Sequence, residues 1–415
     1  MKLREIFEGV KVADFSWVIV GPRVARELAV HGATVVRVES HRVPDMLRVV
    51  APFKEGIPGI DRSALWMAFN ANKYGMSLHL SNPKAQEVAR KLVMWADIVT
   101  DSMTPGTLKR FGLDYESVRK IKPDIIYYST TQAGQYGPYA KFQAYGQEGA
   151  AIAGFYDLFG WPDRPPAPPF TAYTDQIAPP VLLAALMAAL AYRRKTGKGM
   201  YLEQCQWEAG MHFLGPALLD YRVNGRVLRR MGNSDPYAAP HAIYQCQGTD
   251  RWVAITVRHD TEWKAFCQAI GAPQWTQEPR FATLLGRKEN EDELNQLVEE
   301  WTAGYTPEEV MWKLQHAGVP AGVLQNNQDL FEDPQLKHRG HFQWLPHKVI
   351  GMASHQAPSY RLSKTPYQLK KAGPALGEDN EFVYKNILGY SDEDIAQFLL
   401  DGIITTEADV PYVSI

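Results

Sequence analysis

The sequence predicts an α/β protein that has an open parallel sheet and a second, smaller domain. Short apolar runs alternate with helix-like stretches from the N-terminus to about Gln135, as in a sheet with helices on its faces. The apolar runs are continuous, which is typical of strands that are covered on both faces. A chain of 415 residues with 45% hydrophobic content is long enough for two domains, or for one large domain with an insertion.

The predicted elements follow one another in the order that such a sheet requires. Helices are expected from Arg23 and from Pro83, and the strand segments are VKVADFS, ATVVRVES, LHL, ADIVTD and DIIYYST. Gly32 stands where the first helix should stop, because glycine adopts a left-handed conformation after a helix at little steric cost. These segments account for five strands of the sheet.

A long helix is expected next, after the proline-rich segment GWPDRPPAPP, which should be irregular. The helix prediction rests on the apolar run from Ala178 to Tyr192, about fifteen residues. Pro179 and Pro180 suit its first turn, Asp175 then lies just before it, and KTGKG should end it. A membrane span needs roughly twenty residues, so we interpret this run as a buried helix and expect no membrane association.

The later part of the chain predicts a change of architecture. HAIYQCQGTDRWVAITV is interpreted as two strands joined by a turn, and it precedes helices expected near 260–270, 291–301 and 307–317. The tail from about Gly340 contains prolines and ends in the amphipathic stretch SDEDIAQFLLDG. The predicted division is a large domain at 1–210, a small α+β domain at 225–325 and a return to the large domain at 330–415.

Composition and missing motifs exclude several classes of function. A net charge of −2, from 44 basic and 46 acidic residues, provides no general attraction for nucleic acid or anionic lipid. Three cysteines are too few and too far apart for a disulfide framework or a paired zinc motif, so no metal is expected. The sequence has no phosphate-binding or dinucleotide-binding glycine loop, no GxSxG and no HExxH. We expect a cytoplasmic protein, because no apolar signal segment follows the first basic residues.

Six segments carry a resemblance to a known family, and they occur in the family's order over nearly the whole chain. They are VKVADFSWVIVGPRVARELAVHGATVVRVE, NANKYGMSLHL, MTPGTLKRFGLDYESVRKIKPDIIYYS, GQYGPYA, ALAYRRKTGKG and LGYSDEDIAQFLLDGII. The chain resembles class III CoA-transferases, a family that includes formyl-CoA and carnitine CoA-transferases and the 2-methylacyl-CoA racemases. The resemblance implies a Rossmann-like large domain and two interlocked chains. We therefore expect a homodimer, or a heteromer with a similar chain, whose linkers at 160–172 and 340–375 are irregular.

The resemblance implies that Asp175 is the catalytic nucleophile. In transferases of the family an aspartate precedes the apolar helix that leads to the R-x-K-T-G-[KR]-G signature, and Asp175 has that place here. The pattern by itself favours an aspartate that caps the helix, and the resemblance reverses this preference. A carboxylate nucleophile would carry CoA through an anhydride and an aspartyl-CoA thioester. CoA is then a substrate, and no permanently bound cofactor is expected.

The resemblance also implies which residues contact CoA. Lys73 in NANK and Arg110 in LKRFG have positions that the family associates with CoA. Arg42 is a weaker candidate, because His41 occupies the aligned place. Val18 and Met103 are further expected contacts. Each cation can equally be an ordinary solvated side chain.

The residues expected to contact the acyl group are Ile19, Gln132 and Tyr145. Ile19 stands where formyl-CoA transferases have a glutamine. Gln132 is followed by Ala133, which replaces a tyrosine of the family. Tyr145 occupies the place of the histidine that racemases pair with the aspartate. Formyl and oxalyl substrates are therefore not expected, and two-base racemisation has no obvious second base.

These departures predict a CoA-transferase that uses a bulky or aromatic acid, such as a benzylsuccinate-like acceptor, with succinyl-CoA as donor. Two alternatives stay open. One is an acyl-CoA racemase of the same superfamily, and the other is a non-catalytic subunit of a heteromeric transferase.

Overall fold

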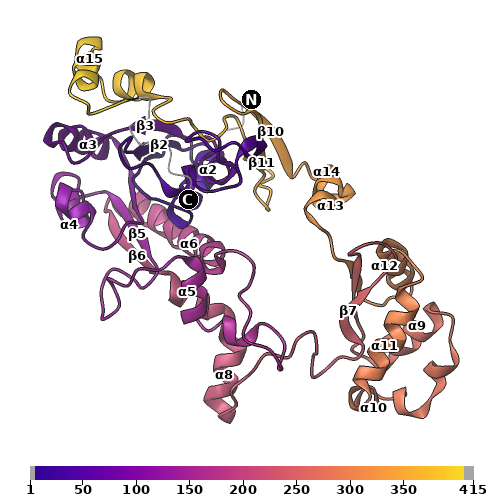
Figure 1. Cartoon of the computed structure of the whole chain (residues 1–415). Coiled ribbons are helices and arrows are strands. Elements are labelled where there is room, and N and C mark those ends of the chain that lie inside the picture. The colour runs from indigo at the N-terminus through magenta and orange to yellow at the C-terminus, as the bar shows by residue number, and fades with distance from the viewer. Residues whose placement is uncertain (1–4, 406–415) are drawn as a thin grey trace. The chain divides into compact units, whose positions relative to one another are not determined.

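A computed structural model describes residues 5–405 of the chain as two compact units (Figure 1). The larger unit contains the described residues up to Phe155, then Pro169–Leu219, and the described residues from Gln335 onward. The smaller unit contains Tyr156–Pro168 and Asp220–Pro334. The proline-rich segment therefore groups with the smaller unit, whereas the sequence placed it in the large domain.

The larger unit is built on one six-stranded parallel sheet, which confirms the predicted α/β class. Its strand order is β3-β2-β1-β4-β5-β6, the order of doubly wound nucleotide-binding folds. The strands are β1 Lys11–Asp14, β2 Thr34–Glu39, β3 Tyr74–Ser77, β4 Ile98–Asp101, β5 Ile126–Thr131 and β6 Met200–Cys205. The third strand ends before the predicted segment LHL, and β6 joins the sheet from beyond the long helix.

Helices cover both faces of this sheet, which explains the continuous apolar strands. Ile98 and Ile126 pack with the first helix and the long helix, whereas Val99 and Tyr127 pack on the opposite face with the third helix. Adjacent residues of one strand thus enter different cores. The helices of this unit are α1 Val20–Val30, α2 Ala64–Asn70, α3 Pro83–Trp95, α4 Tyr115–Ile121, α5 Gly146–Ile152, α6 Tyr173–Thr196, α7 Gln206–Met211 and α8 Gly215–Asn224, whose last residues lie in the smaller unit.

Helix α6 has 24 residues and ends near the predicted KTGKG, but its predicted start at Pro179 and Pro180 was wrong. It begins at Tyr173, which places Asp175 inside the first turn and Pro179 and Pro180 in its second and third turns. Within residues 5–405 it alone is long and apolar enough to cross a membrane, and half of its most apolar stretch is buried. Leu182 and Leu186 pack against α1, so the helix forms part of the core of this unit.

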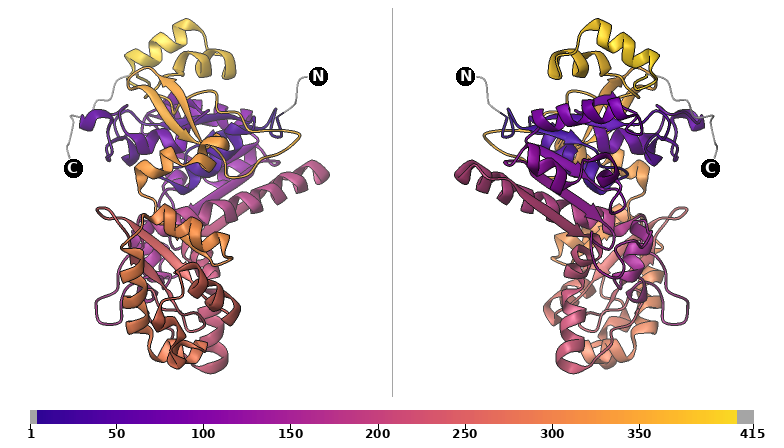
Figure 2. Two further views of the ribbon diagram at one scale, coloured as in Figure 1. Left: turned by 90° about the vertical axis from the view of Figure 1, so that its right-hand side faces the viewer. Right: turned by 90° about the vertical axis from the view of Figure 1, so that its left-hand side faces the viewer.

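The returning C-terminal part completes the larger unit. Strands β10 Phe342–His347 and β11 Gly351–Gln356 pair as an antiparallel hairpin, so the expectation of a wholly irregular 340–375 was wrong. Figure 2 shows this orange hairpin against the indigo and purple N-terminal part of the same unit. Helix α15 Asp392–Leu400 lies beside α3, where Lys84 forms an ion pair with Asp401 at 2.7 Å.

The smaller unit has an antiparallel sheet in the order β7-β8-β9, with helices packed on one buried core. Its first two strands and three of its helices lie where the sequence predicted them. The elements are β7 His241–Gln245, β8 Trp252–Thr256, α9 Asp260–Ala269, α10 Leu284–Glu289, α11 Glu291–Thr302, α12 Pro307–His316, β9 Ala321–Val323 and α13 Asn327–Glu332. A short helix, α14 Pro334–His338, leads back to the larger unit.

Candidate active site

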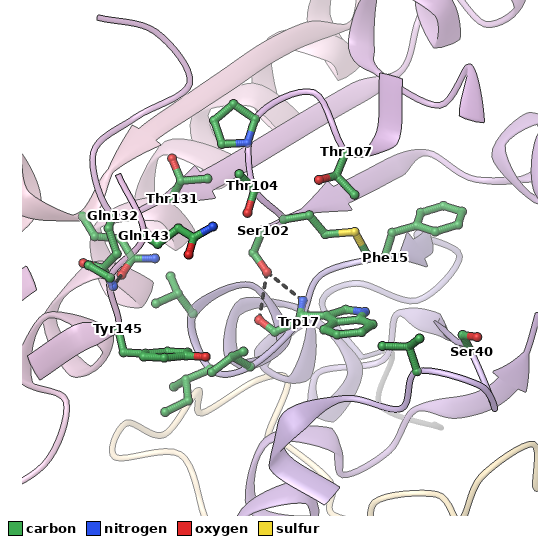
Figure 3. Close-up of a pocket in the computed structure, with 18 of the residues that line it drawn as sticks. Phe15, Trp17, Ser40, Ser102, Thr104, Thr107, Thr131, Gln132, Gln143 and Tyr145 are labelled. Carbon is green, nitrogen blue, oxygen red and sulfur yellow. Dashed lines mark hydrogen bonds between the residues drawn. The ribbon is translucent and has the colours of Figure 1, made fainter. Parts of the chain in front are cut away.

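A cavity of about 840 Å³ opens at the carboxyl ends of the parallel strands. Each of the six strands contributes residues at or just beyond its carboxyl end, for example Trp17, Ser40, Leu78, Ser102, Gln132 and Gln206. Ligands of open α/β sheets bind at this edge, because the loops that leave the strands there diverge. Figure 3 shows Gln132, Gln143 and Tyr145 at one end of the view and Phe15 and Ser40 at the other. All of these lining residues belong to the larger unit.

Asp175 lines this cavity although its side chain is almost fully buried, with 5% of the residue exposed. Ala172 is the N-cap residue of α6, and no side chain forms a cap hydrogen bond there. The interpretation of Asp175 as a helix cap is therefore wrong. Burial raises the pKa of Asp175 to about 7, against the opposing effect of the hydrogen bond that Gln132 donates. The carboxyl thus changes its charge near neutral pH, and strongly shifted pKa values of this kind are concentrated at functional sites.

The absence of a side chain at Gly146 makes room for the Asp175 carboxyl. Gly146 begins α5, and a Cβ atom there would lie 2.6 Å from Asp175 Cγ and 2.7 Å from Ala172 Cβ. Real Cβ atoms do not approach other atoms so closely. Only glycine allows α5 to come this near to the carboxyl.

We expect Gly146→Ala to lower kcat/KM of the activity that the resemblance implies by about 100-fold, because displacing the expected nucleophile by about 1 Å has effects of that size. Steady-state kinetics would measure the loss, and thermal denaturation would show whether the fold survives. Gly215→Ala is the matched control, since a Cβ there meets nothing within 4 Å. Equal activity of the two variants would contradict the placement of Gly146.

The loop after β1 brings Trp17, Val18 and Ile19 to the cavity wall. The Ser102 hydroxyl accepts a hydrogen bond from the Trp17 N–H at 2.7 Å and donates one to the Trp17 carbonyl at 2.8 Å (Figure 3). Val18 has a φ of 65°, which is unfavourable for a β-branched residue, and its N–H donates to Asp45 at 3.1 Å. The surrounding hydrogen bonds therefore hold a strained backbone at the cavity.

Lys73 does not reach the cavity, which corrects the expectation that it contacts CoA. It is fully buried, and its Nζ donates to Asp14 at 2.8 Å, to the Pro22 carbonyl at 2.9 Å and to Asn70 at 2.9 Å. An ammonium group has three hydrogens, and all three are used. Lys73 therefore supports the sheet edge beneath the loop after β1.

The remaining predicted residues divide into two groups. Arg110 and Met103 line the cavity, as do Gln132 and Tyr145, and Arg110 is exposed. Arg42 is not among the lining residues. Sequence reasoning missed Gln206, whose only signal is a polar residue directly after a strand.

Known proteins that are similar to this chain include several CoA-transferases. The sequence pattern of CoA-transferase family III matches residues 7–380. The succinyl-CoA–D-citramalate CoA-transferase of Chloroflexus aurantiacus is 29% identical over 96% of this chain and 98% of its own. The beta subunit of the succinyl-CoA–L-malate CoA-transferase of that organism is 28% identical over 93% and 95%. A crystal structure of a CAIB/BAIF family protein from Brucella suis has a TM-score of 0.84 and 29% identity, over 92% of this chain and 100% of its own.

The parallel sheet with a cavity at its carboxyl edge is the architecture of a ligand-binding α/β protein. Since the family pattern spans most of the sequence, the chain belongs to CoA-transferase family III. It is a CoA-transferase by family.

Proposed function

We propose that this enzyme moves CoA between two carboxylic acids with Asp175 as the covalent nucleophile. The observation that carries the proposal is a carboxyl that is buried, lines the large cavity and has no role in capping its helix. A buried carboxylate has lost most of its hydration, which makes it a better nucleophile.

The proposed reaction conserves the energy of the thioester. The Asp175 carboxylate attacks the acyl-CoA carbonyl, and the C–S bond breaks to give a mixed anhydride and CoA thiolate. The thiolate then attacks the aspartyl carbon, which releases the donor acid and leaves an aspartyl-CoA thioester. The acceptor carboxylate repeats these steps in reverse. Water must stay out at the anhydride stage, because hydrolysis would end the transfer.

The proposed CoA contacts lie where the strands β1 and β4 end. Val18, Met103 and Arg110 line the cavity there, and we propose Arg110 as a phosphate contact because an arginine can donate two hydrogen bonds to a phosphate group. Ile19, Gln132 and Tyr145 line it as well and are the proposed acyl contacts. CoA enters and leaves as a substrate in this proposal.

We further propose succinyl-CoA as the donor and a bulky or aromatic acid as the acceptor. Two of the relatives described above are named for succinyl-CoA, which supports the donor. The aromatic side chains that line the cavity support the acceptor, and they include Phe15, Trp17, Phe111, Phe142 and Tyr145. A panel of acids tests this choice, and turnover confined to short aliphatic acids would contradict it.

Peptide mass spectrometry tests the covalent step. The enzyme is incubated with succinyl-CoA and other acyl-CoAs, with and without hydroxylamine. We expect a CoA adduct, converted by hydroxylamine into a hydroxamate, on the peptide that contains Asp175. Adducts on another residue, or none with any donor, would overturn the proposal.

The pH dependence of the reaction follows from the buried carboxyl. Only ionised Asp175 can attack, and its pKa is raised to about 7. We expect kcat/KM for the acyl-CoA to rise about tenfold per pH unit below pH 7 and to level off above it. A flat profile from pH 5.5 to 8.5, measured with a stable acyl-CoA, would show that Asp175 ionisation does not control the reaction.

The proposed assembly is an interlocked homodimer, or a heteromer with a similar chain. One relative is named as a beta subunit, which supports the second form. Light scattering at micromolar concentration distinguishes either from a monomer. We place the enzyme in the cytoplasm, where its three free cysteines would stay reduced.

A further inference from the structure

A chain of polar side chains runs from Asp175 back to its own helix. Gln132 Nε2 lies 3.3 Å from Asp175 Oδ1 and 2.7 Å from Gln206 Oε1. Beyond Gln206 the contacts continue through Thr130 and Gln204, which do not line the cavity, to the carbonyl of Ala178 in α6. We call the four side chains between the two ends the amide chain: Gln132, Gln206, Thr130 and Gln204.

The far end of the amide chain determines its direction. The Ala178 carbonyl can only accept, so the Gln204 group 2.9 Å away must be its amide nitrogen. Gln204 Oε1 then accepts from the Thr130 hydroxyl at 3.0 Å. Since this hydroxyl has one hydrogen, it meets Gln206 only as an acceptor, and Gln206 Nε2 lies 3.5 Å from it.

The same direction of donation fixes the orientation of Gln206 and Gln132, at the Asp175 end of the amide chain. Because Gln206 Nε2 faces Thr130, Gln206 Oε1 faces Gln132 and requires a donor from it. Gln132 therefore presents its NH₂ group both to Gln206 and to Asp175. An N–H donated to a carboxylate favours the ionised form, whereas an amide oxygen in the same place would repel it.

This orientation leaves the oxygen of the Gln132 amide without a hydrogen-bond donor. Gln132 Oε1 is buried and has no hydrogen-bond partner within the described residues. It lies against Gly149, where a Cβ atom would come within 2.1 Å. A buried acceptor without a partner is unfavourable, so this orientation has a cost that the hydrogen bond to Asp175 alone must offset in an isolated glutamine. The hydrogen bond to Gln206 and the rest of the amide chain favour the same orientation.

We propose that Gln206, Thr130 and Gln204 are positioning residues that keep the Gln132 N–H directed at Asp175. The inference rests on the proposed role of Asp175 in the reaction, but it concerns the ionisation of that carboxyl, which can be measured without turnover. Thr130 is the decisive member, because its hydroxyl alone transmits direction from Gln204 to Gln206 and it touches neither Asp175 nor the cavity.

Thr130→Val and Thr130→Ser make a matched pair of variants. Valine keeps the shape of threonine but removes the hydroxyl, and serine keeps the hydroxyl. The first readout is the pH midpoint of carbodiimide modification of Asp175 in the substrate-free protein, measured by peptide mass spectrometry, since the reagent requires the protonated carboxyl. The second is kcat and KM for the acyl-CoA, and the third is thermal stability.

We expect Thr130→Val to raise the modification midpoint by about one pH unit, the equivalent of one lost hydrogen bond. The same loss should lower kcat about tenfold below the midpoint, with KM for the acyl-CoA nearly unchanged. Thr130→Ser should match the wild type in midpoint and kcat. An equal midpoint in all three proteins, or a lower melting temperature of Thr130→Val without a change of midpoint, would overturn the inference. Absence of an Asp175 adduct in the wild type would instead contradict the proposed function and leave the midpoint comparison valid.

Discussion

Replacing Asp175 with asparagine is expected to lower kcat for CoA transfer by at least about 10⁴-fold. An amide oxygen cannot form the anhydride, because it is a poor nucleophile and carries no charge. Asp175→Glu retains the carboxylate but moves it by about one bond length, so we expect a loss of roughly 10²-fold to 10³-fold. Initial rates with a discontinuous assay for both acyl-CoAs would measure these effects.

Asp175→Asn is also expected to stabilise the folded protein at alkaline pH. The folded-state pKa of Asp175 is raised from the ordinary 3.8 to about 7, so the unfolded chain binds fewer protons between these values. Folding stability therefore falls as the pH rises from about 4 to 7, because a charged carboxylate becomes buried. Asparagine carries no charge and removes that cost, so the free energy of unfolding at pH 8 should rise by on the order of a few kcal/mol. Urea denaturation of the two proteins at pH 5 and pH 8 measures the difference.

Opposite signs of the two effects distinguish a functional carboxyl from a structural one. A carboxyl that served the fold would lose stability when replaced, and activity would fall only as far as folding did. Wild-type activity in Asp175→Asn would refute the assignment of Asp175 as the nucleophile. A stability loss at pH 8 would indicate that the carboxylate has a favourable partner in the folded state.

Asp14→Asn is expected to cause the largest loss of stability. Asp14 is fully buried, Lys73 Nζ lies 2.8 Å from its carboxylate, and Arg37 Nη1 lies 3.7 Å from it. Burial opposes the ionisation of Asp14, but the charges of Lys73 and Arg37 outweigh it and keep its pKa at about 2. Burial has also lowered the pKa of Lys73 to about 8, against the attraction of Asp14. Without the carboxylate, two buried cations would lose a counter-ion, which costs about 3–5 kcal/mol.

Urea denaturation at pH 7 would measure this loss as a lower midpoint. Glu116→Gln is a suitable control, because Glu116 and Arg119 form an exposed ion pair at 2.7 Å whose removal should leave the midpoint unchanged. A loss below about 1 kcal/mol in Asp14→Asn would mean that Lys73 is neutral or hydrated in the folded protein.

Asp14→Asn should also affect the cavity. Arg37 also pairs with Asp45, which holds the Val18 N–H, so binding of CoA should weaken in Asp14→Asn.

The sequence by itself determined the α/β class, the order of the elements and the candidate nucleophile. Strands covered on both faces need apolar residues at successive positions, and this requirement is visible in β1, β2, β4 and β5 without any knowledge of distant contacts. The antiparallel strands and helices of the smaller unit were predicted for similar local reasons. Asp175 was found through the family resemblance, whereas the local pattern alone favoured an aspartate that caps the helix.

Only the tertiary structure decided which polar groups meet. Lys73 and Asp14 are 59 positions apart and become partners because β1 and β3 lie on the two sides of β2, so a cation expected at the ligand is buried in the fold. The start of α6 at Tyr173 was also out of reach, since prolines inside a helix are tolerated only where packing supports the helix around them. Gly146 and Gln206 are also far from Asp175 in the sequence. Gly146 precedes it by a long loop, and Gln206 follows it beyond α6 and β6. Their roles depend on distances between strand ends, and these distances follow from the packing of the sheet, which no local pattern in the sequence encodes.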